Sequence, residues 1–160
     1  LGDVYKRQGG ASRAICVEMA LAGASDIIVL NIDEGGQTLV DLLNRHTPAK
    51  ASFVLWNHSF DIPSDTDIVI NATSVGLYPN IEQRLNINVD SLTPDMVVAD
   101  CIPNPAYTHF VKDAISKGCK HVLPGMNMLV NQAVIAIKYW TGEDVDESVM
   151  RKELKDVLGL

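Results

Sequence analysis

Short apolar runs alternate with segments of helical periodicity along most of this 160-residue chain. Five such runs predict strands: 26–31, 52–55, 67–71, 96–100 and 121–123. The first is continuously apolar over Ile27–Leu30, which is typical of a strand that is buried on both faces of a parallel sheet. The alternation of strands and helices predicts an α/β fold with a doubly wound parallel sheet.

Glycines mark the predicted ends of helices. The first predicted helix buries Ala14, Val17 and Leu21, and Gly23 is placed to end it. Gly118 has the same place after the third predicted helix. Each of these helices therefore has a defined end before the next strand.

The C-terminal part of the chain follows another pattern. Residues 128–140 are apolar nearly all round and the pattern stops at Thr141-Gly142. The helix predicted there needs more than one surface to cover it. An amphipathic helix follows, with Asp146 as its N-cap. Its predicted buried side consists of five residues: Val149, Met150, Leu154, Val157 and Leu158.

A glycine pair, Gly9-Gly10, leads directly into the first predicted helix. Glycine lets backbone N–H groups approach a phosphate closely, and the positive end of the helix favours its negative charge. The stretch is half of a dinucleotide-binding turn, with Arg7 where the fingerprint has its first glycine. The alternative is a flexible helix start that binds nothing.

Polar residues follow several predicted strands, at the edge where an open parallel sheet binds ligands. They fall in four segments: Asn31-Ile32-Asp33, Asn71 to Gly76, Asp100-Cys101 and Gly125 to Met128. Such residues also cap helices and form turns, which is the alternative for each segment taken alone. Their regular occurrence after successive strands favours a ligand site.

Composition and charge narrow the range of partners. A net charge of −7 argues against a broad nucleic-acid surface, and no apolar run approaches the length of a membrane span. Cys16, Cys101 and Cys119 lack CxxC spacing, so we expect small buried thiols that stay reduced in the cytoplasm. No metal site is expected, because four histidines lack ligand spacing: His46, His58, His109 and His121.

Residues 1–8 differ in composition from the rest of the chain. They are mostly polar where the dinucleotide fingerprint needs a buried strand, and they contain no initiator methionine or signal peptide. We therefore expect an anomalous or artefactual N-terminus on an N-terminally truncated fragment.

Four ordered motifs resemble the C-terminal, cofactor-binding portion of the shikimate dehydrogenases and their quinate/shikimate relatives. The motifs are Gly9 to Ala14, Asn71 to Gly76, Asn104-Pro105 with Thr108, and Gly125 to Gln132 with Trp140-Thr141-Gly142. The resemblance implies hydride transfer between a nicotinamide cofactor and a cyclic ketone of the shikimate pathway. It also implies a Rossmann-like domain at 9–127, followed by helices at 128–160 that complete an interface with a substrate domain.

The resemblance implies roles for single residues. Two groups of three would hold the pyrophosphate and the adenosine ribose, respectively: Gly9, Gly10 and Ala11, and Asn31, Ile32 and Asp33. Thr73 and Ser74 would line the cofactor cleft, and Cys101 and Gly125 would lie near the nicotinamide. Gln132 would contact a substrate hydroxyl, because its amide both donates and accepts hydrogen bonds. The alternative for Gln132 is a polar residue satisfied within a helix interface.

Departures from the family pattern bear on specificity. NADP-preferring members usually have arginines at the positions of Ile32 and Gly36, where a guanidinium pairs with the 2′-phosphate. Asp33 adds a carboxylate that suits a ribose hydroxyl and repels that phosphate, so the sequence favours NAD over NADP. Pro103 replaces a tyrosine and Asn127 replaces a glycine, so shikimate, quinate and other cyclohexane acids stay open as substrates.

In this family a preceding domain binds the substrate and supplies the lysine and aspartate of the acid/base pair. We therefore assign no catalytic residue to this chain and expect it to be inactive by itself. Lys6 lies in the anomalous N-terminus without a carboxylate partner. Two alternatives stay open: a dinucleotide-binding or regulatory module without turnover, and a related Rossmann enzyme that acts on another small substrate.

Overall fold

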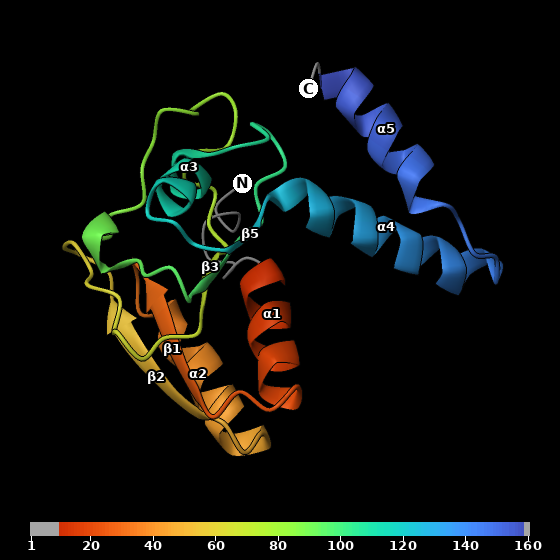
Figure 1. Ribbon diagram of the computed structural model, residues 1–160. Coiled ribbons are helices and arrows are strands. Elements are labelled where there is room, and N and C mark those ends of the chain that lie inside the picture. Colours follow the sequence, from red (N-terminus) through yellow and green to blue (C-terminus); the bar gives the residue numbers. More distant parts are fainter. Residues whose placement is uncertain (1–9, 159–160) are drawn as a thin grey trace, which may run out of the picture. The chain divides into compact units, whose positions relative to one another are not determined.

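The computed structural model describes residues 10–158, and the chain forms two compact units, residues 1–60 and residues 61–160 (Figure 1). The expectations for Gly9, for Lys6 and for the remainder of 1–8 lie outside the described residues. The first unit contains α1 (Gly10–Leu21), β1 (Asp26–Asn31), α2 (Gly35–His46) and β2 (Lys50–Leu55). The second contains β3 (Ile68–Asn71), β4 (Val97–Asp100), α3 (His109–Ser116), β5 (His121–Leu123), α4 (Gly125–Thr141) and α5 (Glu147–Leu158).

The α/β fold with parallel strands is confirmed. β1 pairs with β2 in parallel, and β3, β4 and β5 form a second parallel sheet in that order. The described strands thus belong to two sheets. Residues 1–9, which precede α1, lie outside the described part of the chain.

The core of the first unit lies between α1, α2 and the β1-β2 pair. Its buried residues are Ala20, Val29, Leu39, Val40, Leu43, Ala49 and Ala51. The side of α1 that packs here differs from the predicted one, because Ala14 is exposed and Leu21 is 67% exposed, whereas Ala20 is buried. The small side chain of Ala20 lets α1 approach the core, with Cys16 and Val17 beside it.

The predicted helix ends are confirmed at three glycines. Gly23, Gly118 and Gly142 have φ angles of +102°, +79° and +78°, in the left-handed region that glycine adopts without strain. Gly142 donates its N–H to the carbonyl of Lys138 over 2.9 Å and so ends α4.

The C-terminal helices are less buried than predicted. α4 begins at Gly125, so the expected boundary between 127 and 128 falls inside it. Beyond Val130 no residue of α4 is buried, and Tyr139 and Trp140 are 85% and 81% exposed. Asp146 caps α5 as predicted, because its Oδ1 accepts the N–H of Ser148 over 2.8 Å. The predicted buried side of α5 was wrong.

No residue of α5 is buried, and Val149 and Val157 are 57% and 80% exposed. α5 contacts α4, and a single neighbouring helix is too narrow a surface to cover the apolar stripe. No helix within residues 10–158 is long and apolar enough to cross a membrane.

Candidate functional site

In the first unit, the N-terminal end of α1 and the carboxyl end of β1 lie at the same end of the unit (Figure 1). Gly10 is exposed there, and a Cβ at this position would meet no atom within 4 Å. Packing within the described chain therefore does not require glycine at residue 10. The open space leaves the backbone of this turn accessible to a ligand.

The residues after β1 form a small exposed hydrogen-bond network. The Asn31 amide accepts the N–H of Ile32 over 3.0 Å and donates to Asp33 Oδ1 over 3.1 Å. The same Asp33 oxygen accepts the N–H of Gly35 over 2.8 Å. Asp33 thereby satisfies a free donor at the start of α2, where the helix dipole favours its negative charge.

In the second unit, the parallel register sets Asn71 at the end of β3 opposite Asp100 at the end of β4. Both are buried, with exposed fractions of 2% and 3%. Asp100 accepts three hydrogen bonds: from Thr108 Oγ1 over 2.5 Å, from the N–H of Ile102 over 2.9 Å and from Asn71 Nδ2 over 3.1 Å. A buried carboxylate is stable in this place only because several donors surround it.

Asn71 connects Asp100 to the loop that follows β3 through hydrogen bonds. With its Nδ2 directed at Asp100, its Oδ1 accepts the N–H and the hydroxyl of Thr73 over 3.0 and 2.7 Å. The Thr73 hydroxyl in turn accepts the N–H of Val75 over 3.1 Å. Asp100, Asn71 and Thr73 thus form a connected polar network, and the exposed side chains of Thr73 and Ser74 project from a loop of fixed shape.

Asp100 and its neighbour have shifted pKa values. Burial raises the pKa of Asp100, although the hydrogen bonds from Thr108, Ile102 and Asn71 act in the opposite direction. Burial also raises the pKa of the partly buried Cys101 thiol, and the negative charge of Asp100 adds to that rise. The Cys101 thiol is therefore a poor nucleophile at neutral pH.

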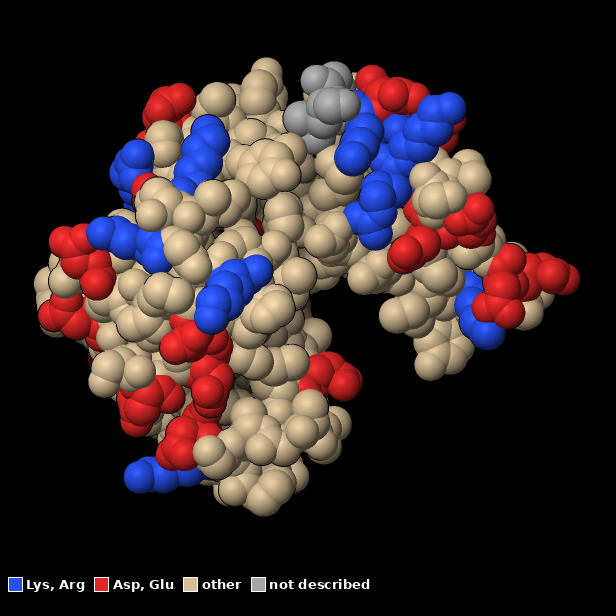
Figure 2. Space-filling view, viewed as in Figure 1, with Lys and Arg blue, Asp and Glu red and all other residues tan. Residues whose placement is uncertain are grey.

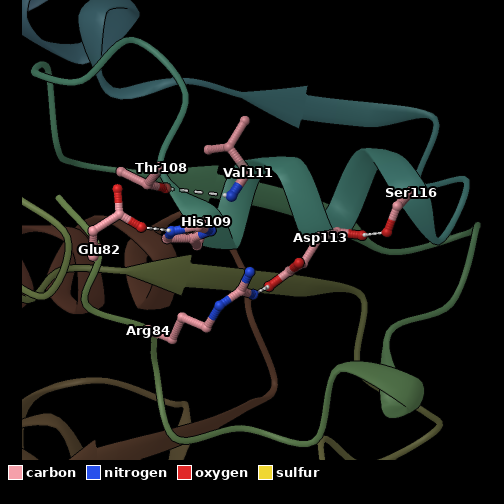
Figure 3. A network of polar contacts seen from close by, with 7 residues as sticks. All are labelled: Glu82, Arg84, Thr108, His109, Val111, Asp113 and Ser116. Carbon is pink, nitrogen blue, oxygen red and sulfur yellow. Dashed lines mark hydrogen bonds and ion pairs between the residues drawn. The ribbon is translucent and has the colours of Figure 1, made fainter.

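Thr108 connects the buried network to α3, and Figure 3 shows its contact with Val111 and the polar contacts beside it. Thr108 is the N-cap of α3, and its hydroxyl oxygen accepts a hydrogen bond from the N–H of Val111 over 3.3 Å. The same hydroxyl donates a hydrogen bond to Asp100. Two ion pairs hold the long segment between β3 and β4 against α3: Arg84 with Asp113 at 2.8 Å and Glu82 with His109 at 3.1 Å. The second pair is charged on both sides only when the imidazole is protonated.

Gly125 packs against the chain that follows β4. A Cβ on this buried glycine would lie 2.3 Å from the carbonyl oxygen of Ile102, closer than any contact that two such atoms can make. The start of α4 thus lies directly on the Asp100–Ile102 segment. The structure therefore brings Thr73, Ser74, Cys101 and Gly125 to one edge of the second sheet.

Gln132 and Asn127, the two residues of α4 that the sequence connects with substrate binding, lie beyond Gly125. Gln132 is exposed about two turns beyond Gly125 on α4. The side chain of Asn127 accepts a hydrogen bond from the Arg151 guanidinium of α5, and Arg151 also lies 3.7 Å from Glu147. Asn127 therefore links the two C-terminal helices.

The thiols differ from the prediction that all three are buried. Cys119 is 8% exposed and donates to the carbonyl of Thr93 over 3.2 Å, but Cys16 and Cys101 are only partly buried. The prediction was wrong for these two because each lies at the margin of its unit's core rather than inside it. Within residues 10–158, no three His, Cys, Asp or Glu side chains are grouped as a metal site.

The sequence pattern did not single out Asp100, Thr108 and Asn71 as one network. Its signal was present as polar residues at the ends of two apolar strands, but only the strand register shows that Asn71 and Asp100 face each other. On the face shown in Figure 2, acidic and basic side chains lie side by side over much of the surface.

Comparison with known proteins supplies the wider context. Residues 125–155 match the family described as Shikimate 5'-dehydrogenase C-terminal domain. The shikimate dehydrogenase (NADP(+)) of Methanococcus aeolicus is 35% identical over 150 residues, which cover 94% of this chain and 53% of the relative. That of Desulforamulus reducens is 34% identical and covers 91% of this chain and 51% of the relative. The chain spans about half the length of the curated relatives it matches.

Solved structures also resemble this chain over nearly its whole length. The 5-ketofructose reductase of a Gluconobacter strain is 45% identical with a TM-score of 0.87, covering 93% of this chain and 53% of that one. The shikimate 5-dehydrogenase of Listeria monocytogenes, solved with shikimate and NAD, is 27% identical with a TM-score of 0.76, covering 94% of this chain and 53% of that one. The resemblance predicted from the sequence motifs is confirmed.

Proposed function

Since this chain matches the C-terminal part of the shikimate dehydrogenase family, we propose that it is the cofactor-binding part of an oxidoreductase of that family. The observation that carries the proposal is the 35% identity over 150 residues, which covers 94% of the chain. The intact enzyme would transfer a hydride between a nicotinamide dinucleotide and a carbonyl or hydroxyl carbon of its substrate.

The residues of the first unit fit a dinucleotide. Gly9, Gly10 and Ala11 would hold the pyrophosphate at the start of α1, and the open space above Gly10 supports such an approach. Asn31 and Asp33 would face the adenosine ribose. When bound, the nicotinamide ring of the cofactor would supply or accept the hydride.

We propose that polar residues of the second unit contact the nicotinamide part of a dinucleotide cofactor. We assign Thr73 and Ser74 to the wall of the cleft, because the buried Asn71–Asp100 pair fixes the loop that carries them. Cys101 and Gly125 would lie near the nicotinamide. The raised pKa of Cys101 supports a neutral thiol in contact with the cofactor rather than a reactive group.

We propose that NAD is preferred over NADP. Ile32 is 77% exposed and offers no charge to a phosphate, and the exposed carboxylate of Asp33 would repel the 2′-phosphate while accepting from a ribose hydroxyl. The curated relatives compared above bear NADP(+) in their names, whereas the Listeria structure holds NAD. A nicotinamide dinucleotide is common to both.

A substrate domain would cover the exposed apolar side of α4. Ile135, Tyr139 and Trp140 are 57%, 85% and 81% exposed, which is unusual for large apolar residues on one helix. We assign this surface to the remaining half of the enzyme, which would also supply the acid/base lysine and aspartate. Gln132, exposed on the same helix, would contact the substrate from this side.

The first candidate substrate is shikimate or quinate, as in most of the matched relatives. The 45% identity to a 5-ketofructose reductase favours a second candidate, a small keto sugar in which one carbonyl group is reduced to a hydroxyl group. Pro103 and Asn127, which depart from the shikimate dehydrogenase pattern, support this second candidate. Free thiols at Cys16, Cys101 and Cys119 support the cytoplasm as the compartment.

The test is an assay of the full-length protein with both substrates. Shikimate oxidation with NAD and 5-ketofructose reduction with NADH are followed by absorbance of the reduced cofactor, and each is repeated with the phosphorylated cofactor. We expect turnover of one of the two substrates and none by the 160-residue chain alone. Absence of binding of either cofactor to the full-length protein would contradict the proposal.

A further inference from the structure

We propose that Phe53 determines cofactor specificity, because its ring excludes any side chain at position 36 and so keeps an arginine away from the ribose-facing end of β1. The inference rests on the proposed function, in which Asn31 and Asp33 face the adenosine ribose. Phe53 lies on β2 and would not touch the cofactor. Its ring would act by limiting which side chain fits at position 36.

The space beside Gly36 is already filled. Gly36 lies in the first turn of α2 and is buried. A Cβ at this position would lie 2.4 Å from Cε2 and 2.5 Å from Cδ2 of Phe53. Carbon atoms in contact are about 3.5–4.0 Å apart, so the ring occupies the place where every side chain at residue 36 would begin.

The ring of Phe53 is partly buried and packs against neighbours on more than one side. Phe53 lies in the middle of β2, opposite Val29 of β1, and packs against the buried core of the first unit. On the other side of the same space, Asn31 Cβ would be 3.2 Å from the added carbon. A side chain at residue 36 would therefore press on the core through Phe53 and on the ribose-facing loop through Asn31.

The position matters because of what an arginine would do there. In dinucleotide-binding folds, an arginine near the end of the second strand accommodates the 2′-phosphate of NADP. Position 36 lies at the start of α2, three residues after Asp33, whose carbonyl accepts the N–H of Gly36 at 3.5 Å. Ile32 is 77% exposed, so an arginine at that position meets no comparable obstacle. A change of preference towards NADP thus needs a change at residue 53 before residue 36 can contribute.

The first test measures thermal stability of the full-length protein without cofactor. Gly36→Ala is made alone and together with Phe53→Val, which keeps a strand-favouring residue but removes the ring. Glycine to alanine inside a helix ordinarily stabilises. We expect Gly36→Ala to lower Tm when Phe53 is present, and to leave Tm unchanged or raise it when Phe53→Val is present. An equal shift of Tm in both backgrounds would overturn the steric exclusion.

The second test measures NADP binding. Gly36→Arg alone is expected to leave the Kd for NADP unchanged or weaker, whereas Gly36→Arg with Phe53→Val is expected to lower it about tenfold relative to Phe53→Val, as one charge-assisted hydrogen bond would. Ile32→Arg is the matched control, and its gain should be the same in both backgrounds. An equal gain from Gly36→Arg with and without the ring would overturn the proposal.

The two tests separate this inference from the proposed function. A protein that binds NAD but shows no coupling between residues 36 and 53 would overturn the role of Phe53 alone. A protein that shows the coupling in Tm yet binds neither NAD nor NADP would contradict the proposed function, and the specificity role with it.

Discussion

The polar residues after β1 and those after β3 and β4 follow the same sequence pattern but have different surroundings. The hydrogen bonds among Asn31, Ile32 and Asp33 are exposed, whereas Asn71 and Asp100 are 2% and 3% exposed. Exposed polar groups can change without leaving a buried donor unsatisfied, and buried ones cannot. Substitutions at the end of β1 should therefore cost little stability. The buried residues at the ends of β3 and β4 instead hold the loop that follows β3 in one conformation.

Glycines show the same contrast. Gly10 has no atom within 4 Å of a potential Cβ, but the Cβ of a residue at 125 would lie 2.3 Å from the Ile102 carbonyl oxygen. Packing does not explain the first glycine, whereas the close approach of α4 to Ile102 explains the second. One residue type thus has different surroundings in the two units.

The largest expected effect is on the buried network. Asp100→Ala leaves the donors of Thr108, Ile102 and Asn71 without their acceptor, and we expect the free energy of unfolding to fall by about 3 kcal/mol or more. Asp33→Ala is the matched control at the exposed network, with an expected loss of about 1 kcal/mol, because only the cap at the start of α2 is removed. Urea denaturation of the full-length protein measures both. Equal losses would contradict the contrast between the two sites.

The next effect comes from the two glycines. Gly125→Ala should lower the free energy of unfolding by about 2 kcal/mol, because the backbone of Ile102 must move away from the new methyl group. Gly10→Ala should change it by about 0.5 kcal/mol or less, since the space is open. The same denaturation series measures both. An equal loss of stability from Gly10→Ala and Gly125→Ala would contradict the contrast between the open space at residue 10 and the close packing at residue 125.

A smaller effect is expected in the pH dependence. Burial raises the folded-state pKa of Asp100, so the folded protein retains this proton over a pH range in which the unfolded chain has lost it. Stability from this group therefore falls as pH rises from the ordinary aspartate pKa of about 3.9 to the raised value, and is constant above it.

Comparison with Asp100→Asn isolates this contribution, because the asparagine does not titrate. Asp90 and Asp146 have lowered pKa values and act in the opposite direction in both proteins, so they cancel in the difference. The free energy of unfolding of the unmodified protein minus that of the variant should fall with rising pH over this range. A difference that rises with pH would mean that the hydrogen bonds to Asp100 outweigh its burial.

The smallest effect on stability is expected at Asp33, and it sharpens the contrast through binding. Asp33→Asn should leave the melting temperature nearly unchanged, because the side chain is exposed and keeps one acceptor oxygen for the N–H of Gly35. It should weaken NAD binding and narrow the difference from NADP, because the carboxylate that repels a phosphate is removed. Calorimetric titration with both cofactors measures this. An unchanged ratio of the two affinities would remove Asp33 from the ribose site.

The strands and helix ends could be predicted because each rests on a local signal. The apolar run at β1 and the glycine after α4 define their elements without reference to the rest of the fold. The buried side of α5 could not, because periodicity identifies an apolar stripe but not the surface that covers it. Ala20 replaced Ala14 and Leu21 on the packed side of α1 for a related reason: spacings of three and four residues fit more than one face.

The polar residues at the strand ends could be identified one by one from the sequence, but their contacts could not. Asn71 and Asp100 were visible as polar ends of strands, yet their hydrogen bond depends on the register between β3 and β4. The ring of Phe53 beside Gly36 depends on how closely α2 lies on β2. Distances between elements set both contacts, and no local pattern in the chain encodes such distances.

The most direct test of the proposed function is a calorimetric titration of the full-length protein with NAD and with NADP. We predict one binding site per chain, with a lower Kd for NAD. Failure to bind either dinucleotide would contradict the assignment of this chain as the cofactor-binding part of the enzyme, and tighter binding of NADP would contradict the roles given to Ile32, Asp33 and Gly36.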